Sequence, residues 1–95
     1  MVIVTGWLRV AAQDRDRYLD GCRPVVDQAR ATPGCIDFSI GADLIDDERI
    51  NIVEQWESLE AVEAFRGAGT PDDQQELIID AHVEQHTIAD TIGLT

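Results

Sequence analysis

The sequence predicts an α+β fold of the ferredoxin-like type, an antiparallel sheet with helices on one face. Two observations support this prediction. Segments with the two-residue period of strands and segments with the helical period follow one another in the order β-α-β-β-α-(α)-β. The stretch from Ile50 to Phe65 also passes from a β-branched strand into an amphipathic helix without a long loop. Because the chain has 95 residues, we expect one domain over residues 1–95.

The first strand is expected from Val2 to Val10, and Gly6 inside it indicates a close approach of another group to the backbone. The first helix is expected from Asp14 to about Ala31, with Asp14 as its N-cap. Pro24 should bend this helix, because proline removes one N–H and crowds the preceding turn. The buried stripe of the helix falls at helical spacing on Tyr18, Cys22, Val25, Val26 and Ala29.

The middle of the chain predicts a hairpin followed by a helix. The second strand is expected from Cys35 to Ile45 and the third from Ile50 to Glu57, joined by an acidic turn at residues 46–48. Ser58 is placed to cap the next helix, because its hydroxyl can accept a hydrogen bond from a free N–H of the first turn. That helix should run from Leu59 to about Phe65.

The last third of the chain is less regular. Residues 66–71 contain two glycines and a proline, which predicts a loop. A short helix is expected from Asp72 or Asp73 to about Ile79, and a fourth strand from Ala81 to about Ala89. The remaining residues to Thr95 are expected to form a loose or swapped tail.

Charge and cysteine content exclude several classes of protein. Seven basic and nineteen acidic residues give a formal net charge of -12, which argues against nucleic acids and anionic membrane surfaces as partners. No apolar run approaches the roughly 18 residues of a membrane span, and no secretory signal is evident. Cys22 and Cys35 lack metal-ligand spacing, so we expect free thiols in a reducing cytoplasm. A disulfide or a reactive nucleophile is the alternative.

The predicted arrangement leaves one face of the sheet without helices. Residues 2–4 and 50–53 include apolar side chains at both alternating positions, so this open face also needs cover. A symmetric homodimer is the simplest closed assembly that covers it, and it would form a dimeric α+β barrel.

Trp56 and Glu54 lie two residues apart in the third predicted strand, so they share one face of the sheet. An indole beside a pocket could stack on a flat aromatic substrate, and its alternative role is a core anchor. Partial burial would raise the pKa of Glu54 and let it act as a base toward a phenol. The alternative for Glu54 is a hydrogen-bonded or interface carboxylate.

His82, Glu84 and His86 alternate along the last predicted strand and share a face. His82 is a second candidate base near the pocket, and its alternative role is a surface or interface histidine. On a strand the two histidines lie about 13 Å apart, too far to bind one ion, so no metal site is predicted. Tyr18 and Phe38 are expected to line the pocket or to join the core.

Three segments carry a resemblance to a known family. One is the first strand with the helix around Tyr18, the second is Thr-Pro-Gly-Cys-Ile-Asp-Phe at residues 32–38, and the third is Glu-Gln-Trp-Glu-Ser-Leu-Glu-Ala at residues 54–61. Together they resemble the antibiotic biosynthesis monooxygenase family of small dimeric α+β barrels. The resemblance covers nearly the whole chain and specifies the fold better than the chemistry, because the same frame serves cofactor-free oxygenation, quinol oxidation and haem breakdown.

The resemblance can be checked residue by residue. Trp56 matches the strand Trp of the cofactor-free, quinone-forming members, but Ile52 stands where they carry Asn and Glu76 stands near their distal Arg. Asn51 is adjacent but should point to the opposite face of the sheet. The positions that the haem-degrading members use are occupied by Gly6, Phe65 and Gln75. Haem binding of that type is therefore not expected.

No glycine-rich phosphate loop and no flavin or nicotinamide fingerprint is present, so no cofactor is predicted. The first functional hypothesis is a cofactor-independent monooxygenase that acts on an electron-rich aromatic compound with O2. Glu54 or His82 would be its base. The residues that contact the small aromatic ligand would be Trp56, Phe65, Tyr18 and Phe38. The alternatives are a non-catalytic dimeric binding domain for an aromatic metabolite and a purely structural dimer module.

Overall fold

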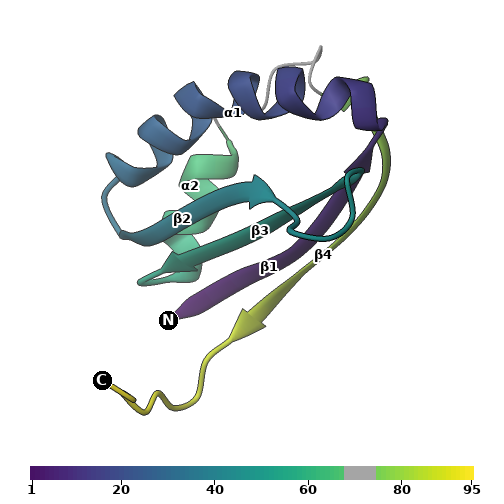
Figure 1. The fold of residues 1–95 in the computed structure, drawn as a ribbon. Coiled ribbons are helices and arrows are strands. Elements are labelled where there is room, and N and C mark those ends of the chain that lie inside the picture. Colours follow the sequence, from purple (N-terminus) through teal and green to yellow (C-terminus); the bar gives the residue numbers. More distant parts are fainter. Residues whose placement is uncertain (68–74) are drawn as a thin grey trace.

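The computed structural model describes residues 1–67 and 75–95, and within them the chain forms one four-stranded antiparallel sheet. The strand order is β2-β3-β1-β4, and both α-helices cover the same face of the sheet (Figure 1). This confirms the predicted ferredoxin-like α+β fold. The elements are β1 (Val2–Val10), the 3₁₀ helix η1 (Ala12–Asp14), α1 (Arg15–Arg30), β2 (Cys35–Ala42), β3 (Arg49–Trp56), α2 (Leu59–Arg66) and β4 (Ile78–Thr87).

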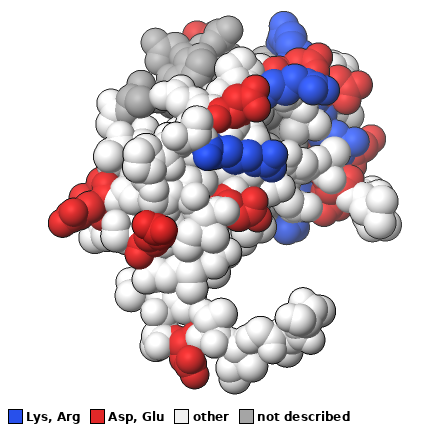
Figure 2. Space-filling view, turned by 90° about the vertical axis from the view of Figure 1, so that its left-hand side faces the viewer, with Lys and Arg blue, Asp and Glu red and all other residues white. Residues whose placement is uncertain are grey.

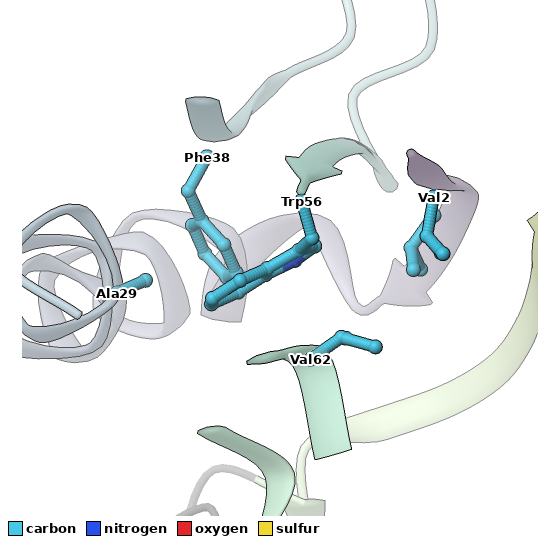
Figure 3. Close-up of a cluster of buried hydrophobic side chains, with 6 residues drawn as sticks. Val2, Ala29, Phe38, Trp56 and Val62 are labelled. Carbon is cyan, nitrogen blue, oxygen red and sulfur yellow. The ribbon is translucent and has the colours of Figure 1, made fainter. Parts of the chain in front are cut away.

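Alternation along the central strands separates a helix-facing side from an open side. Most helix-facing side chains of β1 and β3 are buried, and the buried ones are Val2, Val4, Leu8, Val10, Ile50, Ile52 and Trp56. Ala29 of α1 and Val62 of α2 are completely buried against this face. Figure 3 shows Trp56 between Phe38 and Val62, with Val2 and Ala29 at the periphery of the same cluster. The core therefore lies between the sheet and the two helices.

The second strand ends at Ala42, three residues before the predicted end at Ile45. The carboxylate of Asp43 accepts hydrogen bonds from the backbone N–H groups of Ile45 (3.1 Å) and Asp46 (2.9 Å) and so forms a turn. A hydrogen bond from Asn51, together with these backbone N–H groups, lowers the pKa of Asp43 to about 2. The apolar residues that suggested a longer strand are exposed in this turn.

The helix starts were partly predicted. The Ser58 hydroxyl accepts a hydrogen bond from the Ala61 N–H (3.2 Å), which confirms it as the N-cap of α2. Asp14 precedes α1 but makes no capping bond, so that prediction is wrong. Its carboxylate instead lies 3.3 Å from the Arg17 guanidinium, because the preceding 3₁₀ turn already leads into the helix. The helix continues through Pro24 to its predicted end.

The last strand begins at Ile78, three residues earlier than predicted, and ends at Thr87 rather than at about Ala89. The reason for the early start is that Ile78 pairs with Val10 beyond an irregularity in the register of β1. The first residues of the predicted third helix, 72–74, lie outside the described residues, and its predicted end at Ile79 is wrong because that residue is in β4. Residues 88–95 have no regular structure and extend away from the domain (Figure 1).

At Gly6 the backbone of β1 lies close to that of β4. A Cβ atom added at Gly6 would collide with the carbonyl oxygen of His82 and lie 2.6 Å from the Val83 Cα. The close approach that the sequence predicted at this glycine is therefore confirmed, and the neighbouring atoms are backbone atoms that cannot move away independently of the strand.

We predict that Gly6→Ala lowers the free energy of unfolding by about 1–3 kcal/mol, because the new methyl group overpacks the β1–β4 pair. Urea unfolding followed by circular dichroism measures this change. Gly41→Ala is the matched control, since a Cβ at Gly41 in β2 meets no atom within 4 Å. The control should stay within about 0.5 kcal/mol of the unsubstituted protein. Equal effects of the two substitutions would contradict the close approach of β1 and β4 at Gly6.

Candidate functional site

A cavity of about 410 Å³ lies between the sheet and the two helices. It exceeds the roughly 300 Å³ at which ligand pockets for small molecules begin. Its described lining residues come from α1, β2, β3, α2 and the segment before β4, and they are Tyr18, Cys22, Val25, Phe38, Ile40, Ile52, Glu54, Phe65, Arg66 and Gln75.

The lining follows from the periodicity of each element. Tyr18, Cys22 and Val25 recur at spacings of four and three residues along α1, which places them on one helical face. Phe38 and Ile40 alternate along β2 on the side that faces the helices. The cavity thus has an apolar floor and an apolar helical wall.

Glu54 brings a carboxyl group to this apolar cavity. It lies on β3, partly buried, and its Oε1 atom accepts a hydrogen bond of 3.0 Å from the Trp56 indole N–H. Burial raises the pKa of Glu54 above its usual range, while the hydrogen bond from Trp56 and the charge of Arg66 act in the opposite direction. The rise expected from the sequence is therefore present, and burial is its cause.

Trp56 does not line the cavity, although the sequence suggested it as a stacking wall. Its side chain is completely buried in the core. The ring centroids of Phe65 and Phe38 lie 5.3 and 6.5 Å from that of Trp56. The indole is therefore a core anchor that supports the two phenyl rings, and those rings face the cavity in its place.

Tyr18 and Cys22 form the part of the cavity wall that belongs to α1. Burial, with a smaller effect of the neighbouring Cys22, raises the pKa of Tyr18, so the phenol stays protonated at neutral pH. Both cysteines are free thiols, as the sequence predicted. Burial also raises the pKa of Cys35, which keeps that thiol in its less reactive protonated form.

His82 lies on the open side of the sheet, opposite Glu54. It pairs with Trp7 across the β1–β4 ladder, and the two rings stack with centroids 6.1 Å apart. Its Nε2 atom is 3.0 Å from the Glu84 carboxylate, and both side chains are well exposed. The structure therefore corrects the placement of His82 near the cavity: of the two candidate bases, Glu54 is the one among the described lining residues.

Two polar residues of the lining were not identified from the sequence. Arg66 ends α2 directly after Phe65, and Gln75 follows the predicted loop. The only available signal for Arg66 was its position after an apolar helical stripe. That signal could not show that the side chain borders a cavity, because the cavity exists only when α2 packs on the sheet.

Residues 1–78 match the family described as antibiotic biosynthesis monooxygenase. The chain belongs to this family. The match covers most of the chain and supports a monooxygenase-like role in general terms. A search of curated proteins found no significant match.

Solved structures share the fold at low sequence identity. A candidate antibiotic biosynthesis monooxygenase from Deinococcus radiodurans is 20% identical, with a TM-score of 0.86, and the alignment covers 100% of this chain and 99% of that one. A candidate from Nitrosomonas europaea is 15% identical, with a TM-score of 0.84, over 95% and 100% of the two chains. A candidate from Chloroflexus aurantiacus is 22% identical, with a TM-score of 0.75, over 99% and 98%. These similarities establish the fold alone.

Ile52 and Asn51, at and beside the position of the family Asn, lie on opposite faces of the sheet. Ile52 lines the cavity where the cofactor-free members carry Asn. Asn51 points to the open face, as expected, and is held there by Asp43 (2.9 Å) and Arg49 (2.7 Å). Its amide is therefore turned away from the cavity, and Glu54 is the one carboxyl group among the described lining residues.

We predict that the stability gained by Glu54→Gln relative to the unsubstituted protein increases from pH 4 to pH 7. The folded-state pKa of Glu54 is raised, so its contribution to stability is fully present below the unfolded value, about 4.3, and is lost as pH rises through the folded value. The amide carbonyl of glutamine can still accept the Trp56 hydrogen bond. Urea unfolding of both proteins across this range measures the difference.

A difference that stays constant or decreases with pH would show that burial does not penalise the Glu54 carboxylate. Glu57→Gln serves as the matched control, because Glu57 is exposed and directly follows β3. It separates the effect of burial from the general effect of removing one negative charge from a strongly acidic chain.

Proposed function

We propose that the protein is a cofactor-independent monooxygenase that uses O2 to oxidise an electron-rich aromatic compound of the phenol, anthrone or hydroquinone type. The observation that carries this proposal is the apolar cavity with a single described carboxyl group, Glu54. The Phe38 and Phe65 rings that line it have the shape and polarity to contact a flat aromatic ligand.

Glu54 is the proposed general base. A carboxylate of raised pKa is a stronger proton acceptor than an exposed one, and the apolar surroundings keep water from competing for the substrate proton. The ionised substrate carries the electrons that a cofactor would otherwise supply. Tyr18, which stays protonated, offers a neutral phenol at the opposite wall.

For an anthrone, the reaction balances without any further reductant. Glu54 accepts a proton, and the resulting carbanion transfers one electron to O2. The radical pair combines to form a carbon-bound peroxide anion, in which the new C–O bond holds one oxygen atom of O2. This anion takes the proton back from Glu54 and becomes a hydroperoxide. Loss of the second C–H proton with cleavage of the O–O bond gives a carbonyl group and one molecule of water. The substrate loses four electrons, and O2 accepts them.

The assembly proposed with this function is a homodimer whose two open sheet faces pack together. The open face carries Trp7, and Val53 on it is 45% exposed, which is unusual for a valine in the centre of a sheet. A second copy would remove these side chains from water.

In the described residues, no helix is both long and apolar enough to span a bilayer.

A non-catalytic binding domain for a small aromatic metabolite is the second candidate function. The observation that favours it is Ile52, which places a hydrocarbon side chain in the cavity at the position of the family Asn. Such a domain would use the same cavity and the same phenyl rings, but Glu54 would contribute only polarity.

We predict that the purified, metal-stripped protein consumes O2 in the presence of an anthrone or a dihydroxynaphthalene faster than the spontaneous reaction. Glu54→Gln should reduce this rate by about 10²–10⁴-fold, the usual contribution of a general base. Glu57→Gln, which changes an exposed carboxylate outside the cavity, should leave the rate unchanged. An oxygen electrode measures all three.

Uptake that never exceeds the spontaneous rate, together with tight binding of the same compounds, would rule out the oxygenase and support the binding domain. Uptake that survives Glu54→Gln would locate the base elsewhere. Circular dichroism of both variants excludes loss of the fold as the reason for lost activity.

A further inference from the structure

We propose that Arg66 determines ligand specificity by binding an anionic substituent, so that the preferred ligand of the cavity is an aromatic acid. This inference rests on the proposed use of the cavity as an aromatic site, but it does not require turnover. It names the chemical class of the ligand and gives a role to a residue that the family resemblance leaves unassigned.

Almost all basic side chains of the protein are engaged by described groups. All seven are arginines, and six of them are engaged by described groups. Arg9, Arg17, Arg23 and Arg49 form ion pairs with acidic side chains, and Arg15 and Arg30 donate to backbone carbonyl groups. On the face shown in Figure 2, basic side chains accordingly lie next to acidic ones. Arg66 forms no ion pair or side-chain hydrogen bond with another residue of the described ranges.

Arg66 lies at the mouth of the cavity. Among the described lining residues it is the one basic side chain, and it is exposed, so it borders the open part of the cavity rather than its interior. Its charge reaches Glu54, because it lowers the pKa of that carboxyl. It is the last residue of α2, where the negative end of the helix dipole favours a cation.

The described border of the cavity carries one acidic and one basic side chain, Glu54 and Arg66. The Phe38 and Phe65 rings meet edge to face with centroids 5.5 Å apart, and a flat ligand packed against this pair could present one substituent to the Glu54 carboxyl and another to the Arg66 guanidinium. A hydroxyl group suits the first and a carboxylate suits the second, because guanidinium groups bind carboxylates through two parallel hydrogen bonds. The reverse orientation would place two carboxylates together. In a chain with net charge -12, a cation at the cavity mouth also offsets the general repulsion of an anionic ligand.

The test compares two probes that differ in one carboxylate, 2-naphthol and 6-hydroxy-2-naphthoic acid, by isothermal titration at pH 7.5. We predict that the acid binds at least about ten-fold more tightly, as expected for one charge-assisted contact. Arg66→Gln should remove this preference, and Arg66→Lys should retain part of it. Because Arg66 is exposed, the preference should also decrease in 0.5 M salt.

Arg23→Gln is the matched control, since it removes a guanidinium from the same protein but outside this cavity. It should leave the preference for the acid unchanged. Equal affinity for both probes, or a preference that survives Arg66→Gln, would overturn the inference. If neither probe binds, the aromatic site and the inference fail together. Oxygen uptake is measured separately, so equal affinity of the unsubstituted protein for the two probes, together with intact uptake, refutes this inference alone.

Discussion

The hydrogen bond from the Trp56 indole to the Glu54 carboxylate connects the core of this protein to its cavity. Trp56 is completely buried at the end of β3, and its indole N–H needs an acceptor there. Glu54, two residues earlier in β3, lies on the same face and accepts this hydrogen bond. The same carboxyl group faces the cavity. The core cannot repack around Trp56 without moving the cavity carboxyl.

The same indole determines the shape of the cavity. Phe38 and Phe65 pack against it from β2 and α2, and both rings border the cavity. The cavity is therefore a continuation of the core in which side chains stop short of one another. Glu54 and Arg66 are the two charged groups at its described border, one partly buried and one exposed. Burial suits Glu54 to the proton transfer proposed for it, and exposure suits Arg66 to the proposed binding of an anion.

Local signals predicted the faces of the elements better than their ends. Helical spacing placed Tyr18 and Cys22 on the buried face of α1, and alternation placed Phe38 on the helix-facing side of β2. All three residues border the cavity. The ends depended on contacts between distant residues. The second strand stops early because Asp43 forms a turn held by Asn51, and β4 starts early because Ile78 pairs with Val10. No pattern within one segment could show either contact.

The sequence by itself determined the ferredoxin-like order of elements, the capping of α2 by Ser58 and the shared face of Glu54 and Trp56, because each depends on residues close together in the chain. Only the tertiary structure decided that Trp56 is an anchor, that His82 lies on the far side of the sheet and that Arg66 borders the cavity. Depth in a core and the borders of a cavity are set by how separate elements pack. Periodicity gives the direction of a side chain from its backbone, but what it meets there depends on elements distant in the sequence.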